Sequence, residues 1–438
     1  MDLLPDDVIL EVLQYLDVRD LLAFRRVCKR LGALVLAGRV WRHRELRLDG
    51  RPPNGSLRVP PASPRERGPL HLLRVAPCLD HLHICAAAGT LRALTTTKCA
   101  VASLTLENNH LSFNAQVYAE VVGHQGALGR LRRVHLIFSR SADVCGVLLD
   151  ALTTLPRLES LTCSMGCPST RASTALVPRP SAPSLRKFSW PLTRGTEPFV
   201  QAVLAGHSAT LEDVELRLSY SGWTSWTDDT VAPLLAALPK LHSLRLNYPN
   251  LPGLPAVAAC RALRKLCVDS IMDKYSTVVE LLRRAKQLRD VRLQLDWSGL
   301  GCEVLEALAS PALERLELQS GGNTEAPPLL RALTTLPALR HLVLRIGDYF
   351  TSSLTAAAAR DLLQGITPAT APALRTLELK MGREPCPHAW VHEDAVRRSA
   401  FSSNSWYSRA PKCGAIVRCA AWTATKIFGK QLSAPTTF

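Results

Sequence analysis

The residues best suited to chemistry lie near the C-terminal end of the chain. Cys386, His388 and His392 lie close together, with Cys413 and Cys419 downstream. Thiolate and imidazole groups are the ligands that zinc prefers. Their spacing matches no common zinc framework, and scattered surface residues are the simpler interpretation. We therefore predict no metal and no cofactor.

No other combination of residues predicts catalysis. The sequence contains no Gly-rich phosphate loop, no Gly-x-Ser-x-Gly and no His-Glu-x-x-His. His81 and His83 alternate along one predicted strand and are expected to face solvent rather than bind a ligand. We expect a protein that is not an enzyme and that acts through its surfaces.

The composition is that of a folded protein with a diffuse positive charge. The 438 residues include 53 Lys and Arg against 37 Asp and Glu, a formal net charge of +16, and 47% are hydrophobic. Part of the excess is concentrated in residues 51–77, with five basic residues against one acidic, and in residues 383–438, with eight against three. This distribution favours solubility and loose electrostatics over a dedicated phosphate-binding surface.

The cysteine pattern and the N-terminus predict an intracellular protein. The 13 cysteines are scattered without a Cys-x-x-Cys pair, which is typical of a reduced compartment, the cytoplasm or the nucleus. Cys163 and Cys267 are expected to be small buried hydrophobes. The acidic N-terminus lacks the apolar core of a signal peptide, and no run approaches 18 apolar residues, so no membrane contact is expected.

Residues 1–50 carry the pattern of three short amphipathic helices. Pro5, followed by two aspartates, favours a helix start. Apolar residues then recur at helical spacing at Val8, Ile9, Val12, Leu13 and Leu16. Asp20 is predicted to cap a second helix, and a third apolar stretch ends at Trp41. The helices carry more apolar residues than one small core needs, which predicts a face that docks onto another protein.

The order of these residues resembles the F-box. The matching pieces are Leu4-Pro5, the Leu13 to Leu16 spacing, Asp20-Leu21-Leu22, Val27-Cys28-Lys29-Arg30 and Trp41-Arg42, with Val40 where the family usually has Leu. An ordinary trihelical cap of a repeat domain is the alternative. The resemblance implies docking to a Skp-family adaptor. The residues assigned to that contact are Leu4, Pro5, Val8, Leu13, Leu16, Leu22, Val27 and Cys28.

From Leu79 onward a motif recurs twelve times, with an apolar residue at its first, fourth and sixth positions. It begins at Leu79, Val101, Leu131, Leu158, Leu185, Leu211, Leu241, Leu263, Leu288, Leu313, Leu339 and Leu374, so the spacing averages about 27 residues. The end of each motif alternates with period two, which predicts a short strand with one buried face. Helix-period runs such as 231–238 lie between the strands. The pattern resembles the leucine-rich-repeat solenoid.

The resemblances imply an α/β fold in which a short trihelical F-box precedes a solenoid, with a parallel sheet on the concave face and helices outside. The expected domains are the F-box at 1–50, a Pro-rich linker at 51–77, about twelve repeats at 78–382 and a C-terminal cap or disordered tail at 383–438. Six prolines within 51–69 favour an extended linker.

The concave face is the second candidate surface. By strand alternation, residues on either side of the middle apolar position point out of the core. The candidates for substrate binding are Arg133, His135, Asp213, Glu215, Arg245, Lys265, Asp290, Arg292, Arg315 and Glu317. Their signs are mixed and aromatic residues are lacking, so we expect a protein partner and no nucleic acid. Plain solvated polar positions are the alternative for each of them.

Together the two regions resemble F-box and leucine-rich-repeat proteins, the substrate receptors of SCF-type cullin ubiquitin ligases. The resemblance implies three partners: a Skp-family adaptor, a cullin scaffold and a protein substrate. A second hypothesis is an interaction scaffold that uses the same surfaces without delivering ubiquitin. A binder of acidic ligands or nucleic acid ranks third.

Overall fold

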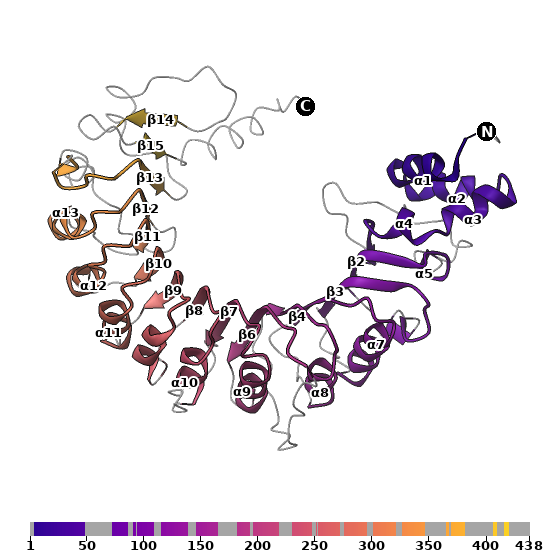
Figure 1. The fold of residues 1–438 in the computed structure, drawn as a ribbon, viewed down its shortest axis with the longest axis horizontal. Coiled ribbons are helices and arrows are strands. Elements are labelled where there is room, and N and C mark those ends of the chain that lie inside the picture. Colours follow the sequence, from indigo (N-terminus) through magenta and orange to yellow (C-terminus); the bar gives the residue numbers. More distant parts are fainter. Residues whose placement is uncertain are drawn as a thin grey trace, which may run out of the picture. The chain divides into compact units, whose positions relative to one another are not determined.

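The computed structural model divides the chain into two compact units (Figure 1). Unit 1 comprises Met1–Leu211 with Ser219–Trp223, and unit 2 comprises Glu212–Leu218 with Thr224–Phe438. The residues that the structure describes are 4–48, 72–85, 91–92, 94–108, 115–138, 146–164, 182–192, 196–218, 230–247, 251, 253–271, 276–295, 301–320, 326–346, 365–367, 369–381, 406–409 and 416–419.

Unit 1 begins with four short helices. They are α1 (Asp6–Tyr15), α2 (Val18–Phe24), α3 (Lys29–Val35) and α4 (Gly38–Trp41). The N-cap of α2 is Asp17, whose carboxylate accepts a hydrogen bond from the Asp20 backbone N at 2.8 Å. The prediction that Asp20 caps this helix is therefore wrong, because the helix begins one turn earlier. Trp41 is buried and its indole Nε1 donates to the Val35 carbonyl at 2.6 Å.

Six strands of unit 1 pair in parallel and in chain order. They are β1 (Glu45–Leu48), β2 (Cys78–Cys85), β3 (Ala100–Asn108), β4 (Arg133–Phe138), β5 (Ser160–Ser164) and β6 (Lys187–Leu192). The helices between them are α5 (Leu72–Val75), α7 (Ala115–Ala127) and α8 (Gly146–Thr153), and α9 (Glu197–Gly206) follows β6. These helices lie along one side of the strands (Figure 1).

Unit 2 repeats the same arrangement. Its parallel strands are β7 (Asp213–Leu218), β8 (Ser243–Asn247), β9 (Lys265–Ile271), β10 (Asp290–Leu295), β11 (Arg315–Ser320), β12 (His341–Ile346) and β13 (Thr376–Met381). The helices are α10 (Val231–Ala236), the 3-10 helix η2 (Leu254–Ala259), α11 (Ser276–Arg284), α12 (Gly301–Ala307) and α13 (Ala326–Thr334). Farther on, β15 (Ile416–Cys419) pairs in parallel with β13, and β14 (Trp406–Arg409) is antiparallel to β15.

The buried apolar ladder explains the parallel register. The middle apolar residues of successive motifs face one another across the strands, as in the pairs Leu82 with Leu104 and Val291 with Leu316. These four side chains are at most 1% exposed. Each of the twelve predicted strands coincides with one of β2 to β13, which confirms the α/β fold class. No helix in the described part of the chain is long and apolar enough to cross a lipid bilayer.

The strand β1 was not predicted, and it joins the helical module to the repeats. Its residue Glu45 pairs with His81 of β2. Just before it, the Arg44 carbonyl accepts a hydrogen bond from the Asp80 N at 2.9 Å. The buried Arg44 guanidinium donates to the carbonyls of Leu13 at 3.0 Å and Leu16 at 2.6 Å, which satisfies carbonyls at the end of α1. Most of the predicted linker lies outside the described residues, and the domain boundaries stay predictions.

Candidate interaction surfaces

Helix α1 has two apolar faces. Ile9 and Leu13 are buried against the other helices of the module. Val8, Val12 and Tyr15 form a second stripe at a spacing of about one helical turn, and all three are exposed. A helix that only completed a small core would carry one apolar face, so the second stripe is available to a partner.

The residues predicted to contact an adaptor fall into three groups. Leu4, Pro5, Val8, Val27 and Cys28 are exposed, Leu16 and Leu22 are half-buried, and Leu13 is completely buried. Leu13 therefore contributes to the core of the module and not to its surface. The contact itself stays a prediction.

Two exposed residues of this surface were missed. Val12 and Tyr15 were assigned to no contact, although the helical period starting from Val8 would have found them. The helix that carries them is fixed by ion pairs to later helices: Asp6 with Arg30 at 2.7 Å and Glu11 with Arg39 at 3.0 Å.

In unit 1, the polar face of the sheet is lined by histidine and hydroxyl groups. We name it the histidine–hydroxyl face, comprising His81, His83, Ser103, Thr105, Glu107, His135 and Ser164. His81 Nδ1 lies 2.9 Å from Ser103 Oγ, and its Nε2 lies 3.3 Å from Thr105 Oγ1. His83 Nε2 lies 2.8 Å from Glu107 Oε2. His81 and His83 are thus half-buried and bonded to the next strand, and the expectation that they simply face solvent is wrong.

The predicted candidates Arg133 and His135 belong to the same face. Arg133 forms an ion pair with Asp80 at 3.3 Å, and His135 Nε2 lies 2.7 Å from Ser164 Oγ. Burial lowers the pKa of His81, although Glu45 acts in the opposite direction. A neutral imidazole both donates and accepts hydrogen bonds, which suits the hydroxyl partners on either side.

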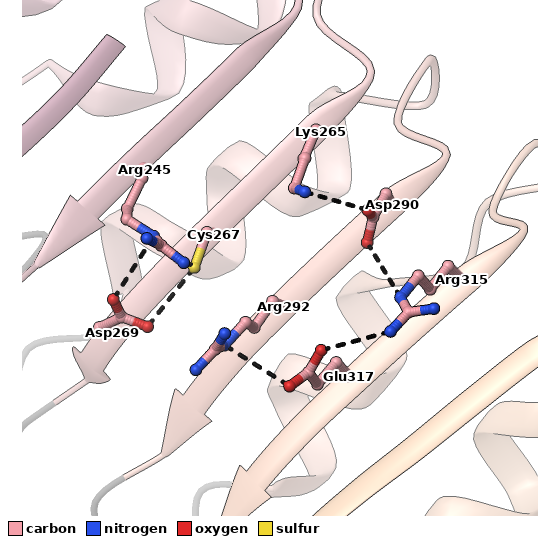
Figure 2. A network of polar contacts seen from close by, with 8 residues as sticks. All are labelled: Arg245, Lys265, Cys267, Asp269, Asp290, Arg292, Arg315 and Glu317. Carbon is pink, nitrogen blue, oxygen red and sulfur yellow. Dashed lines mark hydrogen bonds and ion pairs between the residues drawn. The ribbon is translucent and has the colours of Figure 1, made fainter. Parts of the chain in front are cut away.

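In unit 2, the polar face of the sheet is ionic. We name it the ion-pair ladder, comprising Glu215, Arg217, Arg245, Lys265, Asp269, Asp290, Arg292, Arg315 and Glu317 on β7 to β11. Asp290 lies between Lys265 at 3.6 Å and Arg315 at 3.9 Å, and Glu317 lies between Arg292 and Arg315, both at 3.7 Å (Figure 2). All predicted candidates of unit 2 except Asp213 belong to this ladder. Asp213 is half-buried and pairs with Ser243 of β8.

At the other end of the ladder, Arg245 bridges two carboxylates. It lies 3.9 Å from Glu215 and 3.8 Å from Asp269. Arg217 and Asp269 were not among the predicted candidates, because the prediction considered only the two positions beside the middle apolar residue. The next outward position of each strand, reached by the same alternation, adds both to the ladder.

Cys267 has polar partners and is not a simple buried hydrophobe. It is 2% exposed and lies on the ladder side of β9 (Figure 2). Its Sγ accepts from Arg245 Nε at 3.3 Å and donates to Asp269 Oδ1 at 3.4 Å. Burial raises the pKa of this thiol, although the Arg245 hydrogen bond opposes the shift. The thiol is therefore protonated at neutral pH and is suited to donating a hydrogen bond.

Within the described residues, no group of three or more His, Cys, Asp or Glu side chains is arranged to hold a metal ion. The zinc candidates Cys386, His388, His392 and Cys413 lie outside the described residues, and the side chain of Cys419 is not described.

The described part of unit 1 thus joins a small helical module with an exposed apolar stripe to strand–helix repeats. Residues 1–47 match the family model described as F-box-like, so the N-terminal module is an F-box-like domain. No curated protein matches the chain. Among solved structures, the crystal structure of a TLR13–ssRNA13 complex matches with 15% identity and a TM-score of 0.33, covering 70% of this chain. The match covers half of that chain's length, and a likeness of this degree indicates nothing about what the present protein binds.

Proposed function

We propose that the protein is a substrate-recognition subunit of an SCF-type cullin ubiquitin ligase. Its F-box-like helices bind a Skp-family adaptor, which connects it to the cullin scaffold, and its repeats bind a protein substrate. The scattered cysteines support the cytoplasm or the nucleus as its location. The observation that carries this proposal is where the exposed apolar side chains lie.

These side chains are concentrated in the F-box-like domain, residues 1–47. Of the seven large hydrophobic side chains that are exposed among the described residues, six lie before residue 37: Leu4, Val8, Val12, Tyr15, Val27 and Leu36. The seventh, Val147, lies on α8. Scattered single apolar residues need no explanation, but a cluster on one small module marks a protein-binding site.

The protein needs no catalytic group for this role. Holding a lysine-bearing substrate near the charged conjugating enzyme replaces a bimolecular encounter by an effectively intramolecular one, which raises the effective concentration of the substrate. The hydrogen bonds of Arg44 and the pairing of β1 with β2 support this role, because they fix the docking helices to the first repeat.

The proposal is tested by removing the exposed stripe of α1 without disturbing its core. Val8→Ala combined with Val12→Ala removes two exposed side chains, and we expect recovery of a Skp-family adaptor in a pull-down to fall at least about tenfold, since truncation of interface anchors costs about 1–2 kcal/mol each. Val147→Ala is the matched control, an equally exposed valine on α8, and recovery should be unchanged.

Equal adaptor recovery by the double variant and the control would refute adaptor docking through α1. The scaffold hypothesis is separated by a second measurement. If the adaptor binds but the reconstituted ligase transfers ubiquitin to none of the proteins that co-purify with the repeats, the protein is a scaffold and not a substrate receptor.

A further inference from the structure

The ion-pair ladder has a layered distribution of charge. In each ion pair that it forms between described residues, the basic side chain is at least as exposed as its acidic partner. The Lys265 side chain is 55% exposed and that of its partner Asp290 is 30% exposed. The Arg315 side chain is 41% exposed and that of its partner Glu317 is 7% exposed. The ladder contains five basic and four acidic side chains, but the groups that a partner meets first are its cations.

The length of Arg and Lys side chains does not explain this order. In three ion pairs of unit 1 the acid is the more exposed partner: Arg30 with Asp6 at 36% and 58%, Arg39 with Glu11 at 44% and 51%, and Arg132 with Glu159 at 30% and 56%. Asp290 and Glu317 each lie between two basic side chains (Figure 2). Three other pairs outside the ladder have the base more exposed: Arg133 with Asp80, Arg284 with Glu280 and Arg289 with Glu314. The order therefore varies outside the ladder, whereas within the ladder it is the same in all seven pairs.

The cations also keep hydrogen-bonding capacity. The ladder contacts shared by Lys265, Arg292 and Arg315 measure 3.6–3.9 Å, beyond the range of direct hydrogen bonds. Lys265 and Arg315 are also the more exposed of these cations, at 55% and 41%. A partner carboxylate can accept hydrogen bonds from these two groups while the acids beside them hold them in place.

The same acids argue against nucleic acid as the partner. A phosphate backbone needs a continuous run of basic groups and, when single-stranded, aromatic platforms for its bases. The described outward positions of β7 to β11 carry no aromatic residue, and each cation of the ladder already has an acidic neighbour. A ligand with a few spaced carboxylates fits this surface better than a dense polyanion.

We propose that the ladder binds an acidic, extended peptide segment of the substrate. This inference rests on the proposed function and specifies its substrate class. Lys265 and Arg315 lie on strands two apart, so their backbones are separated by about 10 Å. Acidic side chains two or four positions apart on an extended segment are separated by about 7 or 13 Å, which brackets that distance. Arg245 on β8 lies two residues farther along its strand, in register with Cys267 and Arg292, and adds a cation beside this row.

The test measures the affinity of the full chain for a fluorescent peptide with glutamate at alternating positions. We expect binding by this peptide and none by the same peptide with glutamine or lysine in place of glutamate. The double variant Lys265→Gln and Arg315→Gln should weaken binding about fivefold or more, because it removes two charge-assisted contacts. The matched control is Arg283→Gln with Arg284→Gln on α11, which removes the same charge and should change affinity less than about twofold.

Charge-conserving exchange, Lys265→Arg with Arg315→Lys, should retain binding even if the glutamine variant folds poorly. The inference is overturned if the control weakens binding as much as the ladder variant, if the glutamine peptide binds equally well, or if a single-stranded oligonucleotide binds more tightly than the acidic peptide. The titration contains no adaptor, so failure of adaptor docking would leave its outcome unchanged, and the reverse also holds.

Discussion

The histidine–hydroxyl face of unit 1 and the ion-pair ladder of unit 2 occupy equivalent positions of the same repeat. Thr105 of β3 and Glu317 of β11 both follow the middle apolar residue of their motif, and both are nearly buried. Thr105 lies 3.3 Å from a histidine, whereas Glu317 lies 3.7 Å from each of two guanidinium groups. The buried ladder of leucines fixes the backbone, and the outward positions are therefore free to carry different chemistry.

The two chemistries respond to different conditions. Neutral hydrogen bonds are little affected by salt, but imidazole changes its charge near neutral pH. Long ion pairs at a partly exposed surface weaken as salt rises. The two faces should therefore differ in local stability, which hydrogen exchange measures for each unit by itself.

The largest difference is expected on removing one matched polar group from each face. Glu317→Gln leaves two guanidinium groups with a neutral neighbour, and it should destabilise the surrounding strands by about 2–3 kcal/mol. Thr105→Val removes one neutral hydrogen bond at nearly constant volume and should cost about 1 kcal/mol. Amide exchange of β11 and β3 gives the two values, and equal costs would contradict the contrast between the faces.

A smaller effect is expected when the pH is lowered, and only in unit 1. His207 is buried and its Nδ1 accepts the backbone N–H groups of Ser184 at 3.1 Å and Leu185 at 3.3 Å. Burial lowers the pKa of His207 to about 4. The unfolded chain, with an imidazole pKa of about 6.5, binds the proton more readily, so stability is lost as the pH falls below about 6.5.

Between about pH 7.5 and 5, this should destabilise unit 1 by about 1–2 kcal/mol, with the lowered pKa of His81 acting in the same direction. The measurement is exchange of the Leu185 amide, corrected for intrinsic rates, with unit 2 amides as the reference. His207→Gln should flatten the pH dependence. An unchanged slope in that variant would exclude His207 as its source.

The smallest effect concerns salt. Ser164→Ala removes the 2.7 Å contact to His135 and should cost about 0.5–1 kcal/mol. That cost should be the same at about 1 M salt, where the Debye length is about 3 Å. The cost of Lys265→Gln in unit 2 should instead fall toward zero. A salt-sensitive cost for Ser164→Ala would show that His135 is charged in the folded protein.

The repeats could be predicted from the sequence because their signal is dense. Each motif has three apolar positions and recurs twelve times, and this pattern correctly predicted where each of the strands β2 to β13 lies. The strand β1 was missed although Leu46 and Leu48 alternate with polar residues, because four residues directly after a helix are a weak signal. Its partner strand lies about 30 residues farther on, and only the fold brings the two together.

The candidate surfaces were less predictable. The spacing of residues indicates which face of a strand or helix a side chain belongs to, but not how deeply that side chain is buried. The alternation correctly placed Arg245 and Glu317 on one face, but nothing in the sequence indicates that the acid lies below the cations. Leu13 and Val12 are adjacent apolar residues of α1, and of the two only Leu13 was predicted to contact the adaptor. The structure buries Leu13 completely and exposes Val12, because adjacent side chains of a helix point about 100° apart. Leu13 therefore shares the buried face with Ile9, and Val12 shares the exposed face with Val8.

The pairing of β1 with β2 has a thermodynamic consequence for the intact protein. Without β1, the backbone groups on one side of β2 would lose their strand partner and form an open edge, which repeat proteins normally cover with a cap. The F-box-like module provides that cap, so folding of the first repeats and folding of the docking helices are linked. A ligand that binds only the folded helices stabilises them by RT ln(1 + [L]/Kd), about 2.7 kcal/mol at a free concentration of 100 Kd. An adaptor that binds α1, as proposed, would therefore also protect the first repeats of unit 1 from unfolding.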